Sequence, residues 1–257
     1  MKPLPETVSA SIVTYNNQSL IRKILDCLKL CKLDKVYVVD NNSSDSTADI
    51  VCAEYPEVEL IRLNRNVGFG AANNVAINRT GSTYHIIMNP DVTVTPENLL
   101  AMEAFMNSHN DVAVITPKVL NPDGTEQFLP KLNPKFRYIL SGRLENRSRY
   151  FYEMRSRYTF RSMGINEPVN IDLCTGCFMF SRTSMLKKCG GFDERYFMYL
   201  EDADLTREIK KFGRTVYVPS VYVTHEWKRD SVKSLKGMRM HIASMLKYIL
   251  KWAGRKA

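Results

Sequence analysis

Short apolar runs recur along the first half of the chain, and stretches with helical spacing separate them. Such runs, rich in Val, Ile and Tyr, are typical of buried strands. We expect strands over residues 8–15, 35–40, 58–63, 84–88 and 112–116. Strands that alternate with helices form a parallel sheet, because each helix returns the chain to the edge where the next strand starts.

Helices are expected between these strands, over residues 19–30, 47–54, 70–78 and 96–106. The last of them has Thr95 as its cap and Pro96 at the favoured first helical position. Four strand–helix units therefore fit into the first 110 residues. This pattern predicts an α/β fold with a mostly parallel central sheet flanked by helices.

The second half is less regular. Residues 117–166 are basic and rich in aromatic residues, and four prolines interrupt them, so we expect loops and short helices there. Strands are expected over 169–181 and 215–223, around a helix from about residue 201 to 212. We therefore divide the chain into one domain, residues 1–226 with halves 1–116 and 117–226, and a helical extension, residues 227–257.

The extension is predicted to be an amphipathic helix, because its apolar residues recur at helical spacing with basic residues between them. These apolar residues are Leu235, Met238, Ile242, Met245, Leu246, Ile249 and Trp252. Such a helix can attach to an anionic membrane surface, pack on the protein with a solvated basic face, or bind nucleic acid.

Composition indicates a folded globular protein, since 44% of the residues are hydrophobic and 25% are charged. The first twenty residues lack a secretory signal, and no run of eighteen apolar residues is present, so we expect a cytoplasmic location. The six cysteines are expected to be reduced. Cys174 and Cys177 form a lone C-x-x-C without a second pair, which favours burial over a zinc site.

The net charge of +9 is unevenly distributed. Residues 228–257 carry +8 and residues 131–161 carry +7, so the rest of the chain carries −6. The acidic body and the absence of a recognition motif argue against nucleic acid as a partner. The basic terminal helix is instead expected to contact an anionic membrane surface peripherally.

Polar residues follow each of the first four expected strands. In an open parallel sheet, ligands bind beyond the carboxyl ends of the strands, so these residues are candidates for a binding site. They are Thr14, Tyr15 and Asn17, then Asp40 to Asp45, then Asn64 to Asn66, and finally Asn89 and Asp91. Asp40 can accept hydrogen bonds from a base or ribose, whereas Asp45 and Ser46 suit a helix cap.

Five blocks stand out at these strand ends and later in the chain: SIVTYNN, VVDNNSSDST, RLNRNVGFGAANN, MNPDV and YLEDADLTREIKKFG. Together they resemble the family 2 glycosyltransferases, which have the GT-A fold, and most closely the bacterial rhamnosyltransferases that build surface polysaccharides. The blocks span residues 8 to 226 in the family's order. The resemblance implies a nucleotide-diphospho-sugar donor and transfer with inversion.

Donor-binding residues follow from the resemblance. It implies a nucleoside site around Thr14, Tyr15, Asp40 and Arg65, and further donor contacts from Asn17, Asn42, Asn66, Gly68, Phe69, Gly70, Asn73, Asn89 and Asp91. Glycines at a helix start allow a phosphate or ribose to approach backbone N–H groups. The alternative is a tight turn with close helix packing. A dinucleotide-binding fingerprint is disfavoured, because the glycines follow the third strand and not the first.

The motif Asn89-Pro90-Asp91 matches the position of the acidic metal motif in GT-A enzymes, with Asn in place of the first carboxylate. One carboxylate can still hold Mn²⁺ or Mg²⁺, because these ions keep water ligands and take others from the phosphates. The resemblance adds His225 as a second metal ligand. Without the resemblance, the simpler interpretations are that Asn89-Pro90-Asp91 is an ordinary turn and that His225 is a structural histidine.

Three acidic residues begin the helix expected near residue 201. They can simply complement the positive end of that helix. The resemblance instead makes Asp202 the general base that deprotonates the acceptor hydroxyl, with Glu201 orienting the acceptor or the base and Asp204 structural. It also places Thr175, Gly176 and Cys177 along the acceptor, where a strand bulge at Gly176 is the alternative. Trp227 is a further candidate for stacking on a sugar.

The sequence thus favours an inverting glycosyltransferase that moves L-rhamnose from dTDP-rhamnose to a lipid-linked saccharide in cell-surface polysaccharide synthesis. Another donor, such as a UDP-hexose or galactofuranose donor, would use the same mechanism. A nucleotide-sugar-binding protein without catalysis is the alternative from another class, because the first metal carboxylate is missing. Assembly into a homodimer is left open.

Overall fold

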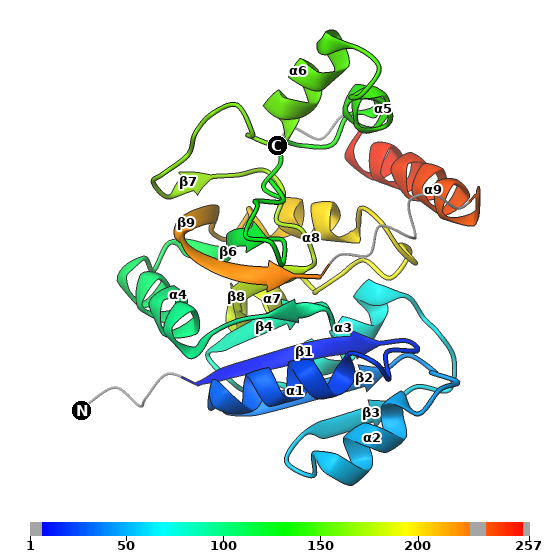
Figure 1. The fold of residues 1–257 in the computed structure, drawn as a ribbon, viewed down its shortest axis with the longest axis vertical. Coiled ribbons are helices and arrows are strands. Elements are labelled where there is room, and N and C mark those ends of the chain that lie inside the picture. Colours follow the sequence, from blue (N-terminus) through cyan, green and yellow to red (C-terminus); the bar gives the residue numbers. More distant parts are fainter. Residues whose placement is uncertain (1–6, 227–234, 254–257) are drawn as a thin grey trace.

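The structure is a computed structural model that describes residues 7–226 and 235–253. Its centre is a nine-stranded sheet with helices on both faces (Figure 1). In spatial order, the strands are β3 (Glu59–Arg62), β2 (Lys35–Asp40), β1 (Val8–Thr14), β4 (Tyr84–Met88), β8 (Phe178–Arg182), β6 (Val112–Leu120), β9 (Arg214–His225) and β5 (Val92–Thr93), and β7 (Val169–Asn170) pairs with β9.

The helices occupy most of the intervals that the sequence pattern predicts. They are α1 (Ile21–Leu30), α2 (Thr47–Glu54), α3 (Phe69–Arg79), α4 (Pro96–Ser108), α5 (Phe136–Leu144), α6 (Arg149–Tyr158), α7 (Thr183–Lys188), α8 (Glu201–Ile209) and α9 (Leu235–Trp252). The Thr95 side chain caps α4 by accepting a hydrogen bond from the Asn98 N–H, as expected.

The sheet is mixed. Strands β3, β2, β1 and β4 run parallel, as the alternation of strands and helices predicts. Strand β8 enters between β4 and β6 and runs antiparallel to both. Strands β6 and β9 are parallel, whereas β5 and β7 run antiparallel to β9. The first half is therefore a parallel sheet, and the second half extends it with strands that run in both directions.

Three expected boundaries are wrong. The strand expected over 169–181 is two strands, because residues 171–177 between β7 and β8 form a loop in which Leu173 makes an isolated bridge to Lys131. The strand expected to end at Thr116 continues to Leu120, and its register with β9 shifts after Pro117, which has no N–H to donate. The helix expected to reach residue 212 ends at Ile209.

Side chains alternate between the two faces of the sheet and build a core on each. Ile86 of β4 faces α1 and α4, where Ile24 and Met102 are buried. Ile87 faces the opposite core, which contains Ile77 of α3 together with apolar residues of α7 and α8. This sandwich holds the strand ends of the first half and the start of α8 in fixed positions.

The terminal helix α9 packs on the protein through one face. Met245, Tyr248 and Trp252 are buried against a cluster that includes Leu173 and Tyr196. Four of its apolar side chains remain exposed: Ile242, Leu246, Ile249 and Leu250. The predicted apolar stripe is thus divided between a packed face and an open face. Within the described ranges, every helix is too short or too polar to cross a bilayer.

Candidate active site

The ends of β1 and β2 bring Thr14 and Asp40 together. The Thr14 hydroxyl donates to Asp40 Oδ1 at 3.1 Å, and the Ser43 N–H donates to Asp40 Oδ2 at 3.0 Å. These bonds fix the carboxylate at the strand end, with 3% of the residue exposed. Tyr15 follows β1 and is 52% exposed, so it offers an aromatic face at the same edge.

The neighbouring turns are built by asparagine. Asn42 has a φ of 64°, a left-handed conformation that asparagine tolerates better than most residues. The Asn17 carbonyl accepts from the N–H groups of Leu20 and Ile21 and so starts α1. Arg65, after β3, is exposed. The predicted donor-binding residues of the first three strands therefore share one edge of the sheet.

The glycine segment before α3 packs against the loop that precedes α8. Gly68 has a φ of 90°, and a Cβ there would lie 2.2 Å from the Phe197 carbonyl oxygen. The N–H of Phe69 donates to the same oxygen at 3.2 Å. Asn66 Oδ1 accepts from the Gly68 N–H. Close packing therefore requires glycine at this position, which ties the donor side of the site to α8.

Two further residues of this segment face the interior. A Cβ on Gly70 would lie 2.9 Å from the Phe192 Cβ, so α3 needs glycine to pack there. Asn73 is fully buried: its Oδ1 accepts from the Ser11 hydroxyl at 2.8 Å, and its Nδ2 donates to the Phe69 carbonyl at 3.1 Å. Asn73 thus holds α3 against β1.

Asp202 lies in the first turn of α8, over the loop that leads into β8. Its Oδ2 accepts from the Gly176 N–H at 3.1 Å. A Cβ on Gly176 would lie 3.0 Å from the Phe69 ring and 3.6 Å from the Asp202 Cβ, so the three residues are in contact. Gly176 lies in a loop, and the predicted alternative of a strand bulge does not apply.

A short chain of contacts connects Asp202 to Asp91. The Cys177 carbonyl, next to Gly176, accepts from the Asn89 N–H at 3.0 Å. Burial raises the pKa of the Cys177 thiol to about 11, and the charges of Asp202 and Asp91 both add to this increase. Cys177 therefore lies within electrostatic reach of both carboxylates. The two acidic motifs, far apart in the sequence, meet at the same edge of the sheet.

The backbone before α8 is strained. Tyr199 and Leu200 have φ values of 69° and 66°, so two consecutive residues without glycine adopt the left-handed conformation. Each such residue costs about 1–2 kcal/mol. Strain of this kind persists where packing over-determines the chain, and it concentrates at functional sites. Here it sets the direction in which α8 begins and hence the position of Asp202.

Glu201 and Asp204 point into the protein. Burial raises the pKa of Glu201 to about 8, and the nearby Asp202 charge adds to this effect. Glu201 Oε2 is buried without a hydrogen bond among the described residues. Asp204 accepts from Trp252 Nε1 at 2.8 Å and from Lys251 Nζ at 2.6 Å, which clamps α9 onto α8. The expectation that Asp204 is structural agrees with these contacts.

Asp91 faces His225 at the point where β5 pairs with the end of β9. Asp91 Oδ1 lies 3.3 Å from His225 Nε2. The amide nitrogen of Gln127 donates to the His225 carbonyl at 2.8 Å and to Asn121 Oδ1 at 2.9 Å. Gln127 Oε1 therefore faces His225 Nδ1, 2.9 Å away, and accepts a hydrogen bond from its N–H. The other ring nitrogen, Nε2, then faces the Asp91 carboxylate.

This arrangement fits a divalent cation. A carboxylate oxygen and an imidazole lone pair that face each other are both metal ligands, and Asp91 Oδ1 is buried without a hydrogen bond to the described residues. Adjacent ligands of an octahedral Mg²⁺ or Mn²⁺ ion lie about 3 Å apart, close to the observed separation. In the described ranges, no group of three or more His, Cys, Asp or Glu side chains gathers for a metal, so water and phosphate would complete the shell.

Lys131, which the sequence did not single out, interacts electrostatically with Asp202. Burial lowers the pKa of Lys131 to about 8, and the charge of Arg155 lowers it further, while Asp202 and Cys177 oppose the shift. Lys131 is therefore an amine close to Asp202. Thr175 and Cys177 are buried, with the hydroxyl and thiol 3.4 Å apart. Trp227, the fourth predicted acceptor residue, lies outside the described residues.

All six cysteines are free thiols, as expected.

Comparison with known proteins gives consistent matches. Residues 9–190 match glycosyl transferase family 2. The N-acetylglucosaminyl-diphospho-decaprenol L-rhamnosyltransferase of Mycobacterium tuberculosis is 30% identical over 229 residues, which is 83% of this chain and 74% of the relative. The rhamnosyltransferase WbbL of Escherichia coli K12 is 25% identical over 247 residues, which is 93% of this chain and 90% of the relative.

Solved structures share the fold. TarS of S. aureus (residues 1–349) aligns with a TM-score of 0.59 and 21% identity over 93% of this chain. GalNAc-T7, solved with UDP, GalNAc and Mn²⁺, aligns with a TM-score of 0.68 and 14% identity over 97% of this chain. This chain spans less than two thirds of both, 65% of that TarS chain and 48% of the GalNAc-T7 chain. The predicted GT-A fold is confirmed.

Proposed function

Because the chain belongs to glycosyl transferase family 2, and is therefore a glycosyltransferase, we propose that it transfers L-rhamnose from dTDP-rhamnose to a lipid-linked saccharide with inversion. The product would serve cell-surface polysaccharide synthesis. The observation that carries the proposal is the chain of contacts that connects Asp202 to the Asp91–His225 pair through Gly176 and Cys177. The names of the rhamnosyltransferase relatives support the choice of donor sugar and of a lipid-linked acceptor.

The donor would lie along the ends of β1 to β4. Asp40 and Tyr15 suit the nucleoside, because a fixed carboxylate can accept from the base or ribose and an exposed ring can stack. Asn89 and Asp91 lie where the diphosphate would have to sit if the nucleoside occupied the ends of β1 and β2. Within this proposal, Asn73 and Gly70 support the donor site from the protein interior, which both residues face.

Asp91 and His225 would hold Mn²⁺ or Mg²⁺, which acts as a Lewis acid on the diphosphate leaving group. Gln127 keeps the His225 ring in the tautomer that turns Nε2 toward Asp91. Asp91 contributes one buried carboxylate oxygen to the same place. The missing first carboxylate of the motif, at Asn89, is then compensated by a ligand from β9.

Asp202 would act as the general base. The Gly176 N–H holds the carboxylate through Oδ2, so that its orientation is fixed before the acceptor arrives. As the acceptor oxygen bonds to the anomeric carbon, its proton passes to Asp202 and the bond to the diphosphate breaks on the opposite face. Burial raises the pKa of Glu201 to about 8, so Glu201 is mostly protonated at pH 7 and is not the base at that pH.

The test is the Asp202→Asn variant. Transfer should fall by about 10²–10⁴-fold, because the amide cannot accept the proton, whereas donor binding with Mn²⁺ should be retained. Asp49→Asn, on the exposed surface of α2, is the matched control and should transfer normally. Turnover by Asp202→Asn close to that of the unchanged protein would show that Asp202 is not the base.

The donor can be identified by thermal shift with Mn²⁺ present. dTDP-rhamnose should raise the melting temperature more than UDP-hexoses or UDP-galactofuranose, since a tightly bound ligand stabilises the folded state by mass action. A larger shift with a UDP-linked sugar would identify that sugar nucleotide as the donor, and the proposed mechanism would stay the same. Binding of a donor without transfer or metal-dependent hydrolysis would favour a non-catalytic binding protein.

The open face of α9 is proposed to contact an anionic membrane surface, which keeps the enzyme near a lipid-linked acceptor. Leu246 and Leu250 are 57% and 77% exposed on this face, and residues 228–257 carry +8. The protein should sediment with phosphatidylglycerol vesicles and not with phosphatidylcholine vesicles. Leu246→Ser combined with Leu250→Ser should abolish sedimentation, whereas Leu100→Ser on α4 should not. Concentration-dependent dimers that these serines disrupt would instead assign the face to a homodimer.

A further inference from the structure

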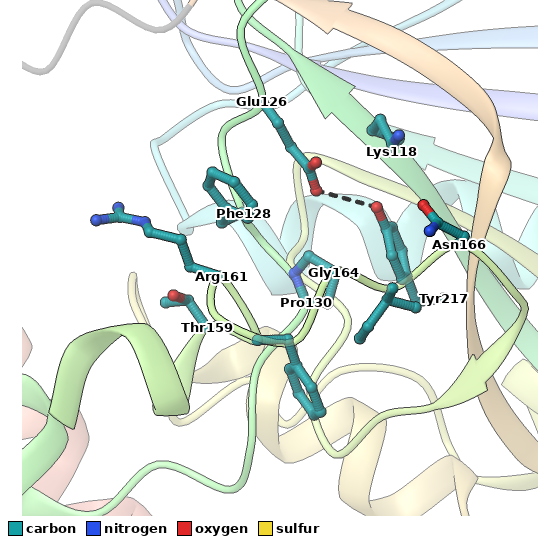
Figure 2. Close-up of a pocket in the computed structure, with 11 residues that line it drawn as sticks. Lys118, Glu126, Phe128, Pro130, Thr159, Arg161, Gly164, Asn166 and Tyr217 are labelled. Atoms are coloured by element: carbon teal, nitrogen blue, oxygen red, sulfur yellow. Dashed lines mark hydrogen bonds between the residues drawn. The ribbon is translucent and has the colours of Figure 1, made fainter. Parts of the chain in front are cut away.

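A separate hollow lies on the far side of the chain segment that carries Gln127. It has a volume of about 120 Å³ and is formed by β6, β9 and residues 126–130 and 159–166 (Figure 2). Tyr217 and Pro130 are buried in its lining, and Asn166 is exposed. A cavity of about 150 Å³ holds one six-membered ring, so a hollow of this size that opens to solvent suits one ring and is too small for a nucleotide.

Residues 126–131 separate this hollow from the proposed metal site. Gln127 is directed to His225, whereas its neighbours Glu126 and Phe128 line the hollow. The segment is fixed at both ends by backbone hydrogen bonds, from the Gln127 N–H to the Val119 carbonyl and between Lys131 and the loop before β8. This segment therefore presents Gln127 to one site and its neighbours Glu126 and Phe128 to the other. A group that occupies the hollow lies next to the reaction cleft without entering it.

Two aromatic residues of the lining have strained backbones. Phe128 has a φ of 48° and Phe160 a φ of 57°. Residues with bulky side chains rarely adopt this left-handed conformation, and it persists only where the surroundings enforce it. Two such residues line one hollow, on segments that are more than thirty positions apart in the chain. Both rings belong to residues of the lining, and the Arg161 guanidinium lies over the Phe128 ring, 5.3 Å from its centroid.

The polar groups of the hollow include both donors and acceptors. Glu126 Oε1 accepts from the Tyr217 hydroxyl at 3.0 Å, and its second oxygen makes no hydrogen bond with the described residues. In Figure 2, Glu126, Lys118 and Asn166 surround the same space. The lining carries one carboxylate, Glu126, and two cations, Lys118 and Arg161, and these polar groups disfavour a purely apolar ligand. A carboxylate, an amine and an amide beside aromatic rings match the hydroxyls and the C–H face of a sugar ring.

We propose that this hollow binds one sugar ring of the acceptor glycan, next to the ring that receives the transferred sugar. The ring would lie against Phe128 and Phe160, with hydroxyls bonded to Glu126 and Asn166. That the ligand is a sugar ring is inferred from the hollow alone. That the ring belongs to the acceptor glycan rests on the proposed function. Occupation of the hollow would also order the segment that positions Gln127, so a correct acceptor would support the metal site.

The test measures saccharide binding directly, by saturation-transfer NMR on the whole chain. The probes are methyl glycosides of N-acetylglucosamine, L-rhamnose, glucose and galactose at about 10 mM, a concentration that detects weak single-ring binding. At least one glycoside should bind. Its affinity should fall about tenfold in Glu126→Gln, as expected for a weakened hydrogen bond to a charged acceptor, and again in Phe128→Ala. Glu153→Gln on α6 and Leu100→Ala on α4 are the matched controls.

The near-isosteric Glu126→Gln keeps the test valid if Phe128→Ala does not fold. Binding of dTDP with Mn²⁺ should be unchanged in both variants, because neither side chain lies on the donor side. If no glycoside binds, or if binding is the same in both hollow variants as in the controls, the inference is overturned. Failure of the proposed function has a different signature: glycoside binding at the hollow without transfer from any nucleotide sugar.

Discussion

Replacement of Glu201 by glutamine should stabilise the protein, and the gain should grow as the pH rises. Burial raises the pKa of Glu201 from 4.5 to about 8. The unfolded chain loses this proton near pH 4.5, whereas the folded chain keeps it until about pH 8. Between these values the unfolded state binds fewer protons, so the stability of the wild-type protein falls with rising pH. Glutamine has the shape of the protonated side chain and cannot ionise.

The magnitude follows from the two pKa values. The ionisation of Glu201 costs the wild-type protein less than about 1 kcal/mol at pH 5, about 3 kcal/mol at pH 7 and about 5 kcal/mol at pH 9. Glu201→Gln should therefore raise the melting temperature by about 6–12 °C at pH 7, using about 2–4 °C per kcal/mol for a protein of this size. The difference should nearly vanish at pH 5.

The assay is urea or thermal unfolding of both proteins from pH 5 to pH 9, without metal or nucleotide. Glu57→Gln, on an exposed side chain paired with Lys29, is the control and should show no growing gain. If Glu201→Gln had the same stability as the wild type at every pH, or a gain that shrank as the pH rose, Glu201 would not be a buried proton carrier.

Three further predictions concern the packing around the site. Gly68→Ala should lower the free energy of unfolding by about 2–4 kcal/mol and weaken nucleotide binding, because a Cβ would clash with the Phe197 carbonyl and the backbone conformation suits glycine alone. An unchanged free energy of unfolding would contradict this. Lys251→Met should lower the free energy of unfolding in urea by about 3 kcal/mol, since it leaves the buried Asp204 carboxylate without its cation. A decrease under 0.5 kcal/mol would count against the ion pair that holds α9 on α8. Gln127→Leu should weaken Mn²⁺ binding, measured by calorimetry, about 10–100-fold, while the stability to urea changes little. If the variant and the wild-type protein bound Mn²⁺ equally well, Gln127 would not orient the His225 ring for the metal.

The first half of the fold could be predicted from local patterns. Each of its strands is an apolar run closed by polar residues, and the cap at Thr95 is visible in the sequence because the side chain that accepts the hydrogen bond adjoins the helix. Thr14, Asp40 and Asp91 could be placed at strand ends for the same reason. Their arrangement at one edge then follows from parallel strands, which all end on the same side.

The second half depends on contacts that leave no local signal. Gln127 orients His225 across 98 positions of sequence, and nothing near Gln127 distinguishes it from other loop glutamines. The loop between β7 and β8 has the apolar pattern of a strand, but Leu173 in it packs against α8 and α9 and makes only an isolated bridge to Lys131. The terminal helix shows the same limit: helical spacing identifies its apolar residues, and only tertiary packing decides that Trp252 is covered while Leu246 stays open.

Asp91 and His225 are proposed to hold the cation on the donor diphosphate, within the cleft that Asp202 serves. The most direct measurement is anomalous diffraction from crystals of the protein with Mn²⁺ and dTDP. We expect one strong Mn²⁺ peak about 2 Å from both Asp91 Oδ1 and His225 Nε2, in contact with the diphosphate, with Asp202 facing the same cleft. Bound dTDP whose Mn²⁺ contacts neither residue, or whose diphosphate lies on another face from Asp202, would contradict it.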